Sequence, residues 1–285
     1  MGIPLRQQHK QKPQAWGPFS AVQSALFHNA ERIGIDPAKI ALAMPMWNPG
    51  DQFDYANRYE FSANGATFQN GSTYIDSAQS LSLSDTTLHD RISSSFLLLT
   101  SVRIDAETTG FHRIFSKDKT SEGDYRDLEL YMEDSTQVKG NLNFKTGDDA
   151  LFIEENVSSF EIGKDLSIAA VQDYSASRQY LYADGDRVGA LTSVNVLSSY
   201  ANNYWIGNWS NTGTRALEGA IHYLLVLKGA YEETAEAIVQ KVHDNPYALW
   251  QPVPQKTIFP PIGDTIFPIN RIFNGPFNGP FAGAL

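Results

Sequence analysis

Short runs of alternating apolar and polar residues follow one another through most of the chain, from about residue 59 to residue 227. Gly, Asn, Asp and Ser separate these runs at intervals of roughly 8–12 residues, a pattern typical of antiparallel β-sandwiches. The clearest pair of runs lies at residues 178–191, on either side of Asp184-Gly185-Asp186. Asp-Gly favours a hairpin, because the tight turn needs positive φ at its central residues. The pattern therefore predicts an all-β sandwich.

In two segments the apolar residues recur at helical spacing instead. A helix is predicted over about residues 18–32, where apolar residues recur at helical spacing. Pro18 suits its first turn and Gly34 suits a C-terminal cap. Its apolar stripe must cover either the sandwich or a neighbouring subunit. A second, short amphipathic helix follows the strand predicted at residues 221–227.

The chain is expected to divide into an N-terminal arm with a helix (1–50), a sandwich (51–250) and an extended C-terminal arm (251–285). The last segment is rich in Pro and Gly, and Pro blocks helices and central strands. Ordinary disordered tails are poor in aromatic residues. We therefore expect this arm to dock its aromatic side chains into pockets on a partner. The anchoring residues would be Phe259, Phe267, Phe273, Phe277 and Phe281.

Composition excludes several classes of protein. The net charge of −10 and the absence of a basic run argue against a nucleic-acid partner, because phosphate binding needs clustered Lys and Arg. The chain has no Cys, so it has neither disulfides nor a thiol nucleophile. Its first residues lack the apolar core of a signal peptide, and no apolar run is long enough to cross a bilayer. We expect no membrane insertion.

Several phrases, in order, resemble one family. They are NGATFQNGSTYIDSAQSLSL (residues 64–83), GFHRIFSK (110–117) and the block from residue 178 to residue 250. The chain resembles the laminin-G/concanavalin A-like sandwiches, in particular those of tailed-phage virion proteins. The resemblance implies a concanavalin A-like antiparallel β-sandwich. It also implies a structural protein of the virion, made in the host cytoplasm, as a capsid decoration or a tail-fibre or tail-tip appendage. Both arms would bind other virion proteins in a multicopy or homo-oligomeric assembly.

A free carbohydrate-binding lectin is the alternative, and host surface glycans are possible partners in either case. Aromatic faces stack on sugar rings, and amides supply hydrogen bonds. The candidate residues, all in one segment, are Tyr204, Asn208, Trp209 and Asn211. Because alternate residues of a strand face the core, we expect Trp205 in the core, and Tyr204 and Trp209 exposed.

A glycan hydrolase is the third hypothesis. Glu122, Asp124 and Asp127 approach the Glu-x-Asp-x-x-Glu signature of sandwich glucanases, but the first carboxylate falls in a turn-like stretch. Retaining hydrolysis needs two carboxyl groups on a rigid strand, about 5–5.5 Å apart. We therefore interpret Glu122 and Asp127 as solvated loop acids, name no catalytic residue and expect no enzyme.

A bound Ca²⁺ is possible, because hard cations take several oxygen ligands and the predicted loops hold suitable acids. The candidate ligands are Asp118, Glu122, Asp124 and Asp184. The six histidines form no cluster, which argues against zinc as a cofactor.

Overall fold

The computed structural model describes the greater part of the sandwich region and the segment that precedes it. The described residues are 19–46, 54–57, 59, 61–69, 72–76, 79–83, 88, 92, 95–105, 110–118, 126–134, 140–147, 152–194, 197, 203–208, 216–229, 231 and 234–251. The chain divides into two units, Met1–Val253 and Pro254–Leu285, and every described residue belongs to the first. The predicted C-terminal arm and its five phenylalanines therefore lie outside the described residues.

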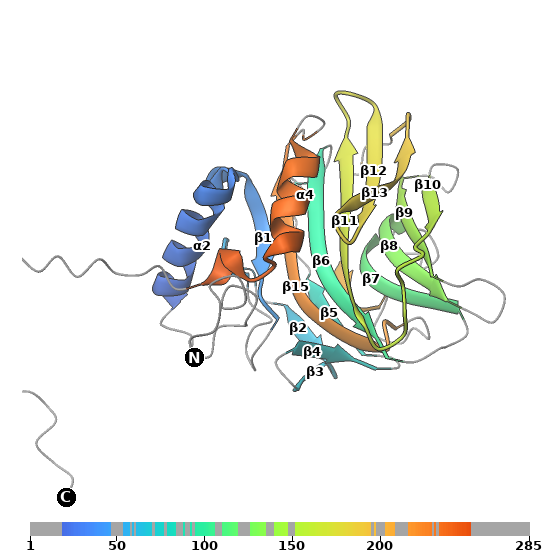
Figure 1. The fold of residues 1–285 in the computed structure, drawn as a ribbon. Helices are drawn as coiled ribbons and strands as arrows, with labels where there is room; N and C mark the ends of the chain where they lie inside the picture. Colours follow the sequence, from blue (N-terminus) through green and yellow to red (C-terminus); the bar gives the residue numbers. More distant parts are fainter. Residues whose placement is uncertain are drawn as a thin grey trace, which may run out of the picture. The chain divides into compact units, whose positions relative to one another are not determined.

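The described strands form two antiparallel sheets (Figure 1). The back sheet has the order β13-β12-β11-β6-β15-β4-β3, and β1 also pairs with β15. Its strands are β1 (Ile40–Met44), β3 (Thr67–Gln69), β4 (Ser72–Ile75), β6 (Phe96–Ile104), β11 (Asp165–Asp173), β12 (Arg178–Ala183), β13 (Asp186–Leu191) and β15 (Gly219–Lys228). The front sheet has the order β10-β9-β8-β7-β14-β5-β2. Its strands are β2 (Ser62–Asn64), β5 (Ser80–Leu83), β7 (Gly110–Asp118), β8 (Arg126–Asp134), β9 (Asn141–Thr146), β10 (Phe152–Asn156) and β14 (Tyr204–Ile206). The predicted all-β sandwich is confirmed.

The main core lies between the two sheets and follows the period of two along the strands, except at the register shifts of β7 and β1. Leu98 of β6, Leu130 of β8 and Phe144 of β9 are all fully buried in it. Phe96 and Phe144 join the sheets through an edge-to-face contact of 6.2 Å. Each such side chain stabilises the fold by about 1.5–3 kcal/mol relative to exposure.

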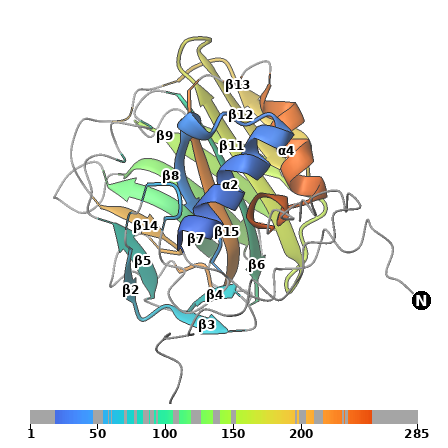
Figure 2. The same ribbon diagram turned by 90° about the vertical axis from the view of Figure 1, so that its left-hand side faces the viewer.

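A second core covers the outer side of the back sheet. The helices α2 (Phe19–Ile33) and α4 (Ala235–Asp244) and the short 3-10 helix η2 (Ala248–Trp250) pack there (Figures 1 and 2). Leu26 of α2 is fully buried, and the ring of Trp250 lies 5.6 Å from that of Tyr223 on β15. The predicted N-terminal helix is confirmed to within one residue at each end, and its stripe covers the sandwich. None of the described helices has the length and apolar character needed to span a membrane.

The segment expected to be an N-terminal arm contributes more than a helix. Residues Ile40–Met44 form β1, which pairs with Leu224–Leu227 of β15, so part of the predicted arm belongs to the back sheet. The sequence IALAM is apolar throughout, because both faces of β1 are buried. The short 3-10 helix η1 (Pro37–Lys39) joins it to α2.

The predicted hairpin at residues 178–191 is confirmed. The strands β12 and β13 pair directly, and the turn residues Asp184 and Gly185 have φ of +50° and +89°. Positive φ at both central residues is the geometry that Asp-Gly favours in a two-residue hairpin.

Candidate functional site

The outer side of the front sheet carries a regular array of polar and aromatic side chains over β7, β8, β9 and β10. Leu130 of β8, Phe144 of β9 and Ile153 of β10 point into the core. The residues that alternate with them along each strand therefore point outward. Strand register sorts these outward residues into three rows across the four strands. The rows are Phe111, Glu133, Asn141 and Asn156; Arg113, Tyr131, Asn143 and Glu154; and Ser116, Glu129, Lys145 and Phe152. We call these residues the β7–β10 face. Figure 1 shows α2 and α4 on the opposite side of the sandwich.

A buried ion pair forms the base of the β7–β10 face. Arg113 and Glu129 are 3% and 4% exposed, and their charged atoms lie 3.3 Å apart. The Arg113 guanidinium also lies 4.0 Å from the ring centre of Tyr131 and 5.4 Å from that of Phe111. Burial, more than the nearby charges, raises the pKa of Tyr131, so its hydroxyl stays protonated at neutral pH. The pair and the two rings fix one another in place.

The half-buried amide of Asn141 and the exposed side chains of Asn156 and Glu154 lie along the edge of this face. The Asn156 amide donates to Asn141 Oδ1 at 3.3 Å, and the Asn141 amide donates to Glu154 Oε1 at 2.8 Å. We call Asn156, Asn141 and Glu154 the amide ladder. An amide nitrogen carries two hydrogens and a carboxylate has two oxygens, so these bonds leave Asn141 and Glu154 further capacity to donate and accept. The ladder can therefore bind a ligand that both donates and accepts hydrogen bonds.

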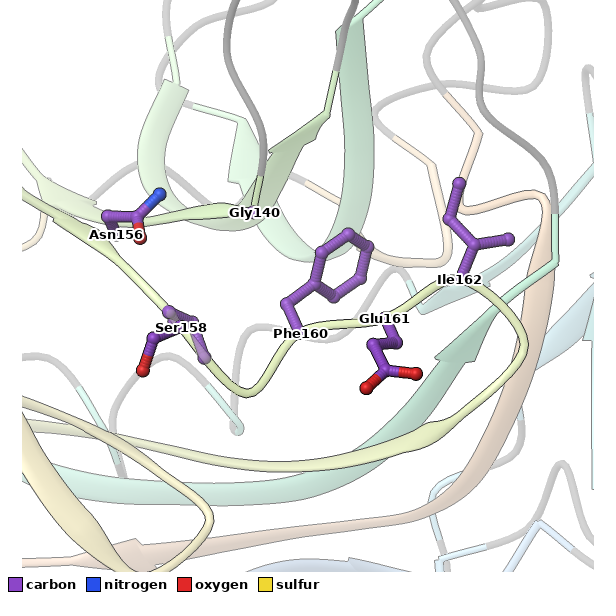
Figure 3. Close-up of a pocket in the computed structure, with 7 residues that line it drawn as sticks. Gly140, Asn156, Ser158, Phe160, Glu161 and Ile162 are labelled. Atoms are coloured by element: carbon purple, nitrogen blue, oxygen red, sulfur yellow. The ribbon is translucent and has the colours of Figure 1, made fainter.

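A pocket of about 490 Å³ adjoins the ladder at the end of β10. It is lined by Gly140, Asn156, Val157, Ser158, Phe160, Glu161 and Ile162. Phe160 and Ile162 extend to one side of their loop and Glu161 to the other (Figure 3). Gly140 has φ of +63°, and a Cβ atom there would lie 3.0 Å from the Phe160 ring. Glycine therefore allows the ring to lie against the backbone. Asn156 belongs to both the ladder and the pocket.

Strand β14, which the sequence predicted to carry part of the sugar-binding site, does not expose the residues that were expected to face solvent. Tyr204 was expected to be exposed, yet it is fully buried, with its ring stacked 5.8 Å from that of Phe115. Ile206 shares this inward side, so Trp205 is on the outer side of β14, where its exposure is 6%. The predicted facing of β14 is therefore wrong, because the core contacts of Tyr204 and Ile206 set the alternation.

Asn208, another candidate for sugar binding, is also fully buried. Its side-chain amide donates to the Gln79 carbonyl at 3.1 Å, and its backbone carbonyl accepts from the Ser116 hydroxyl at 3.1 Å. The side chain is therefore bonded to a neighbouring segment of the fold instead of facing solvent, as a sugar-binding residue would. Trp209 and Asn211 lie outside the described residues.

Two of the four proposed Ca²⁺ ligands, Asp118 and Asp184, are described, and they lie in different parts of the fold. Asp184 lies in the β12–β13 turn, where its carboxylate accepts from Ser159 Oγ at 2.7 Å and from the Ser167 amide at 3.1 Å. Asp118 is the last residue of β7, a nine-residue strand whose first residue lies at the rim that holds Asp184. A strand of that length spans roughly 30 Å. Glu122 and Asp124 lie outside the described residues. Within the described ranges, no group of three His, Asp or Glu side chains suits a metal ion.

Asp127 is not the solvated loop acid that the sequence suggested. It lies in β8, is 1% exposed, and its carboxylate is 2.6 Å from the ammonium of Lys117, which is fully buried. A buried carboxylate needs such a partner, because an unpaired charge in the interior costs several kcal/mol or more. The interpretation as a surface acid failed because the partner lies on the neighbouring strand.

A Ser–His–Asp chain of hydrogen bonds crosses the back sheet. His222 Nδ1 lies 2.7 Å from Ser72 Oγ, and His222 Nε2 lies 2.8 Å from Asp165 Oδ1. The same three residue types occur in serine hydrolases. Here, however, the hydroxyl is buried, at 4% exposure for Ser72, whereas the Asp165 side chain is 58% exposed. In a serine hydrolase the serine hydroxyl must reach the substrate and the aspartate is buried, which is the opposite arrangement. His222 lies at a β-bulge, which redirects its side chain, and the bonds tie β4, β15 and β11 together.

Part of the β7–β10 face is visible in the sequence. Apolar Leu128, Leu130 and Met132 alternate with Glu129, Tyr131 and Glu133 in β8. Alternation shows which residues point outward, but it does not show which strands lie side by side, so the rows remained hidden.

No protein-family model matches the chain, and no relative is found among curated proteins. Solved structures do match. Trypanosoma rangeli sialidase in complex with the inhibitor DANA aligns with a TM-score of 0.60 at 12% identity, over 81% of this chain and 38% of that one. A mutant of this sialidase displaying trans-sialidase activity aligns with a TM-score of 0.61 at 11% identity, over 82% and 39%. The CBM40 of Ruminococcus gnavus IT-sialidase aligns with a TM-score of 0.49 at 14% identity, over 59% and 95%.

The sialidase alignments support the concanavalin A-like fold, and at this identity they show the fold alone. The chain spans less than two-fifths of the length of these sialidases. The expectation that the chain is not an enzyme is corrected by the same finding, because structures that share its fold belong to sialidases. The matches named here are not phage proteins.

Proposed function

We propose that this sandwich binds carbohydrate through the β7–β10 face and the adjoining pocket. One observation supports this most directly. Phe152, Glu154 and Asn156 are successive outward residues of β10, and they lead from an exposed ring, through the amide ladder, to the pocket beside Phe160. An aromatic ring, an amide and a carboxylate on a rigid strand are suited to a sugar, whose rings have apolar faces and hydroxyl edges.

The geometry of the face favours binding without large rearrangement. The Arg113–Glu129 pair and the rings of Phe111 and Tyr131 hold β7 and β8 rigidly beneath the ligand. Preorganised side chains lose little entropy when they bind. The pocket volume also lies in the range of small-molecule sites, about 300–1,000 Å³.

The structural neighbours add support of a coarser kind. The T. rangeli sialidase, with which this chain aligns at a TM-score of 0.57, is described in complex with sialic acid. A protein of which 34% aligns with this chain thus binds a sugar. A carbohydrate-binding domain, previously the alternative hypothesis, is therefore the function that we favour.

A matched pair of exposed aromatic residues tests the proposal. Phe152 on the β7–β10 face is 45% exposed, and Tyr174 in the β11–β12 turn is 48% exposed. Phe152→Ala should weaken glycan binding by about tenfold, or ~1.4 kcal/mol, because a stacking ring is lost. Tyr174→Ala should leave binding unchanged. Both variants are measured by titration calorimetry against the best ligand from a glycan array, with thermal midpoints as folding controls. Equal affinities for the wild type and Phe152→Ala would show that the glycan does not bind at this face.

The placement of the protein in a tailed-phage particle stays a prediction. It rests on the sequence resemblance and on the phenylalanine-rich segment at residues 258–281. Glycan binding and a virion location are compatible, since a domain displayed on a particle can bind the glycans of a cell surface.

A further inference from the structure

We infer, on the basis of the proposed function, that the β7–β10 face takes an uncharged glycan and discriminates against acidic sugars. This differs from the sialic acid that is named with the structural neighbour. The inference rests on the charges and hydrogen bonds around the amide ladder.

Two carboxylates flank Asn141, the central residue of the ladder. Glu154 on β10 accepts from the Asn141 amide at 2.8 Å, and Glu133 on β8 is the cross-strand partner of Asn141. Cross-strand partners have Cβ atoms about 4.5–5.5 Å apart. A sugar bound at Asn141 therefore lies between two groups that repel another carboxylate.

Arg113 is the arginine among the described side chains of this face, and it already binds other side chains. It is 3% exposed, pairs with Glu129 at 3.3 Å and lies against the rings of Phe111 and Tyr131. Acidic sugars are bound most strongly by bidentate contacts to an accessible arginine. To offer that contact, Arg113 would have to leave Glu129 buried and unpaired, which is costly.

The other described cations near the ladder are Lys145 and Lys164. Lys145 lies in the third row of the face, where the register places it between Glu129 of β8 and Phe152 of β10. Beside the pocket, Lys164 pairs with Glu161. Counting the described charged residues of the β7–β10 face, Arg113 and Lys145 stand against Glu129, Glu133 and Glu154.

The hydrogen-bond pattern of the ladder suits neutral sugars. Glu154 accepts hydrogen bonds, and Asn141 retains an N–H that can donate. Adjacent sugar hydroxyls each donate and accept, so one can donate to Glu154 while its neighbour accepts from Asn141. A sugar carboxylate only accepts, and Glu154 cannot donate to it when ionised.

Matched pairs of glycans test the inference on the full chain. Each pair differs by one terminal acidic residue, as lactose differs from sialyllactose, and binding is measured by array and then by calorimetry. We expect neutral members to bind at least tenfold more tightly than their acidic counterparts. Glu154→Gln keeps an acceptor for Asn141 but removes the charge, so it should reduce this preference severalfold. Glu236→Gln, the same change at an exposed position of α4, should leave the preference unchanged.

The outcomes separate the inference from the proposed function. Tighter binding of sialylated members would overturn the inference and retain glycan binding. No binding to any glycan would overturn both. A preference for neutral glycans that Glu154→Gln does not alter, in a variant with the wild-type thermal midpoint, would also overturn the inference, because it assigns the discrimination to this charge.

Discussion

Asp54 is a fully buried carboxyl group that fixes the chain next to β1. It accepts hydrogen bonds from the backbone amides of Ala43, Ala56 and Asn57, at 2.7, 2.9 and 2.8 Å. Burial raises its pKa from 3.8 to about 6, although these amides act in the opposite direction. The desolvation of the charged form thus outweighs the backbone hydrogen bonds, to which Tyr59 adds a fourth.

This pKa predicts a specific dependence of stability on pH. The folded state holds the Asp54 proton up to about pH 6, whereas the unfolded chain releases it near pH 3.8. The stabilisation is therefore complete below pH 4 and is lost as the pH rises through 6, with a total of about 3 kcal/mol. Urea unfolding from pH 4 to pH 7 should show this component in the wild type and not in Asp54→Asn. Asp186→Asn, at an exposed position, should retain it. A wild-type profile in Asp54→Asn would contradict the assignment.

At the scale of elements, the start of β15 depends on a missing side chain. Gly219 pairs with Ile104 of β6 and with Ile75 of β4, so it lies between two strands. A Cβ atom at this position would lie 1.8 Å from the Arg103 carbonyl oxygen. Because that oxygen belongs to the backbone, no side-chain rotation relieves the contact.

Gly219→Ala should therefore separate β15 from β6 locally and lower the free energy of unfolding by on the order of 3 kcal/mol. Gly163→Ala is the matched control, since φ there is +80° but a Cβ atom would meet nothing within 4 Å. That variant should lose only the stability that a left-handed backbone costs a residue with a Cβ atom, about 1–2 kcal/mol. Chemical denaturation compares the two, and equal losses would show that the contact at Gly219 is relieved by a backbone shift.

The same elements show what a sequence can predict. The β12–β13 hairpin was predictable because Asp184-Gly185 determines the turn locally. The facing of β14 was not, because it depends on contacts such as that of Tyr204 with Phe115, far away in the chain. The pocket likewise joins Gly140 to Phe160, and the ion pair of Asp127 lies across two strands. Local chemistry gave the elements, whereas the site depends on register.

At the scale of the whole molecule, the two sheets have different surroundings. Helices from both ends of the unit cover the back sheet, and β1 extends it along one edge of β15. The front sheet carries the polar and aromatic face. This division separates the part that completes the fold from the part that we propose binds a ligand.

The resemblance to virion proteins is tested by removing the last segment. A chain truncated after Gln251 should fold with an unchanged thermal midpoint, because the described cores end at Trp250. It should fail to enter particles, since each buried phenylalanine of the missing segment would contribute about 1.5–3 kcal/mol to anchoring. Particle composition is measured by mass spectrometry after infection. Incorporation at the wild-type level would assign anchoring to another part of the chain.

The contact between α2 and η2 has a mechanical consequence. The Asn29 amide donates to the carbonyls of Leu249 and Gln251, at 3.2 and 2.8 Å, so the first helix holds the last described turn. Tension applied through both ends of the described unit would therefore load the contact between α2 and η2, where these two bonds oppose separation of the ends. We expect this contact to resist such a pull before the strand pairs of the two sheets carry it.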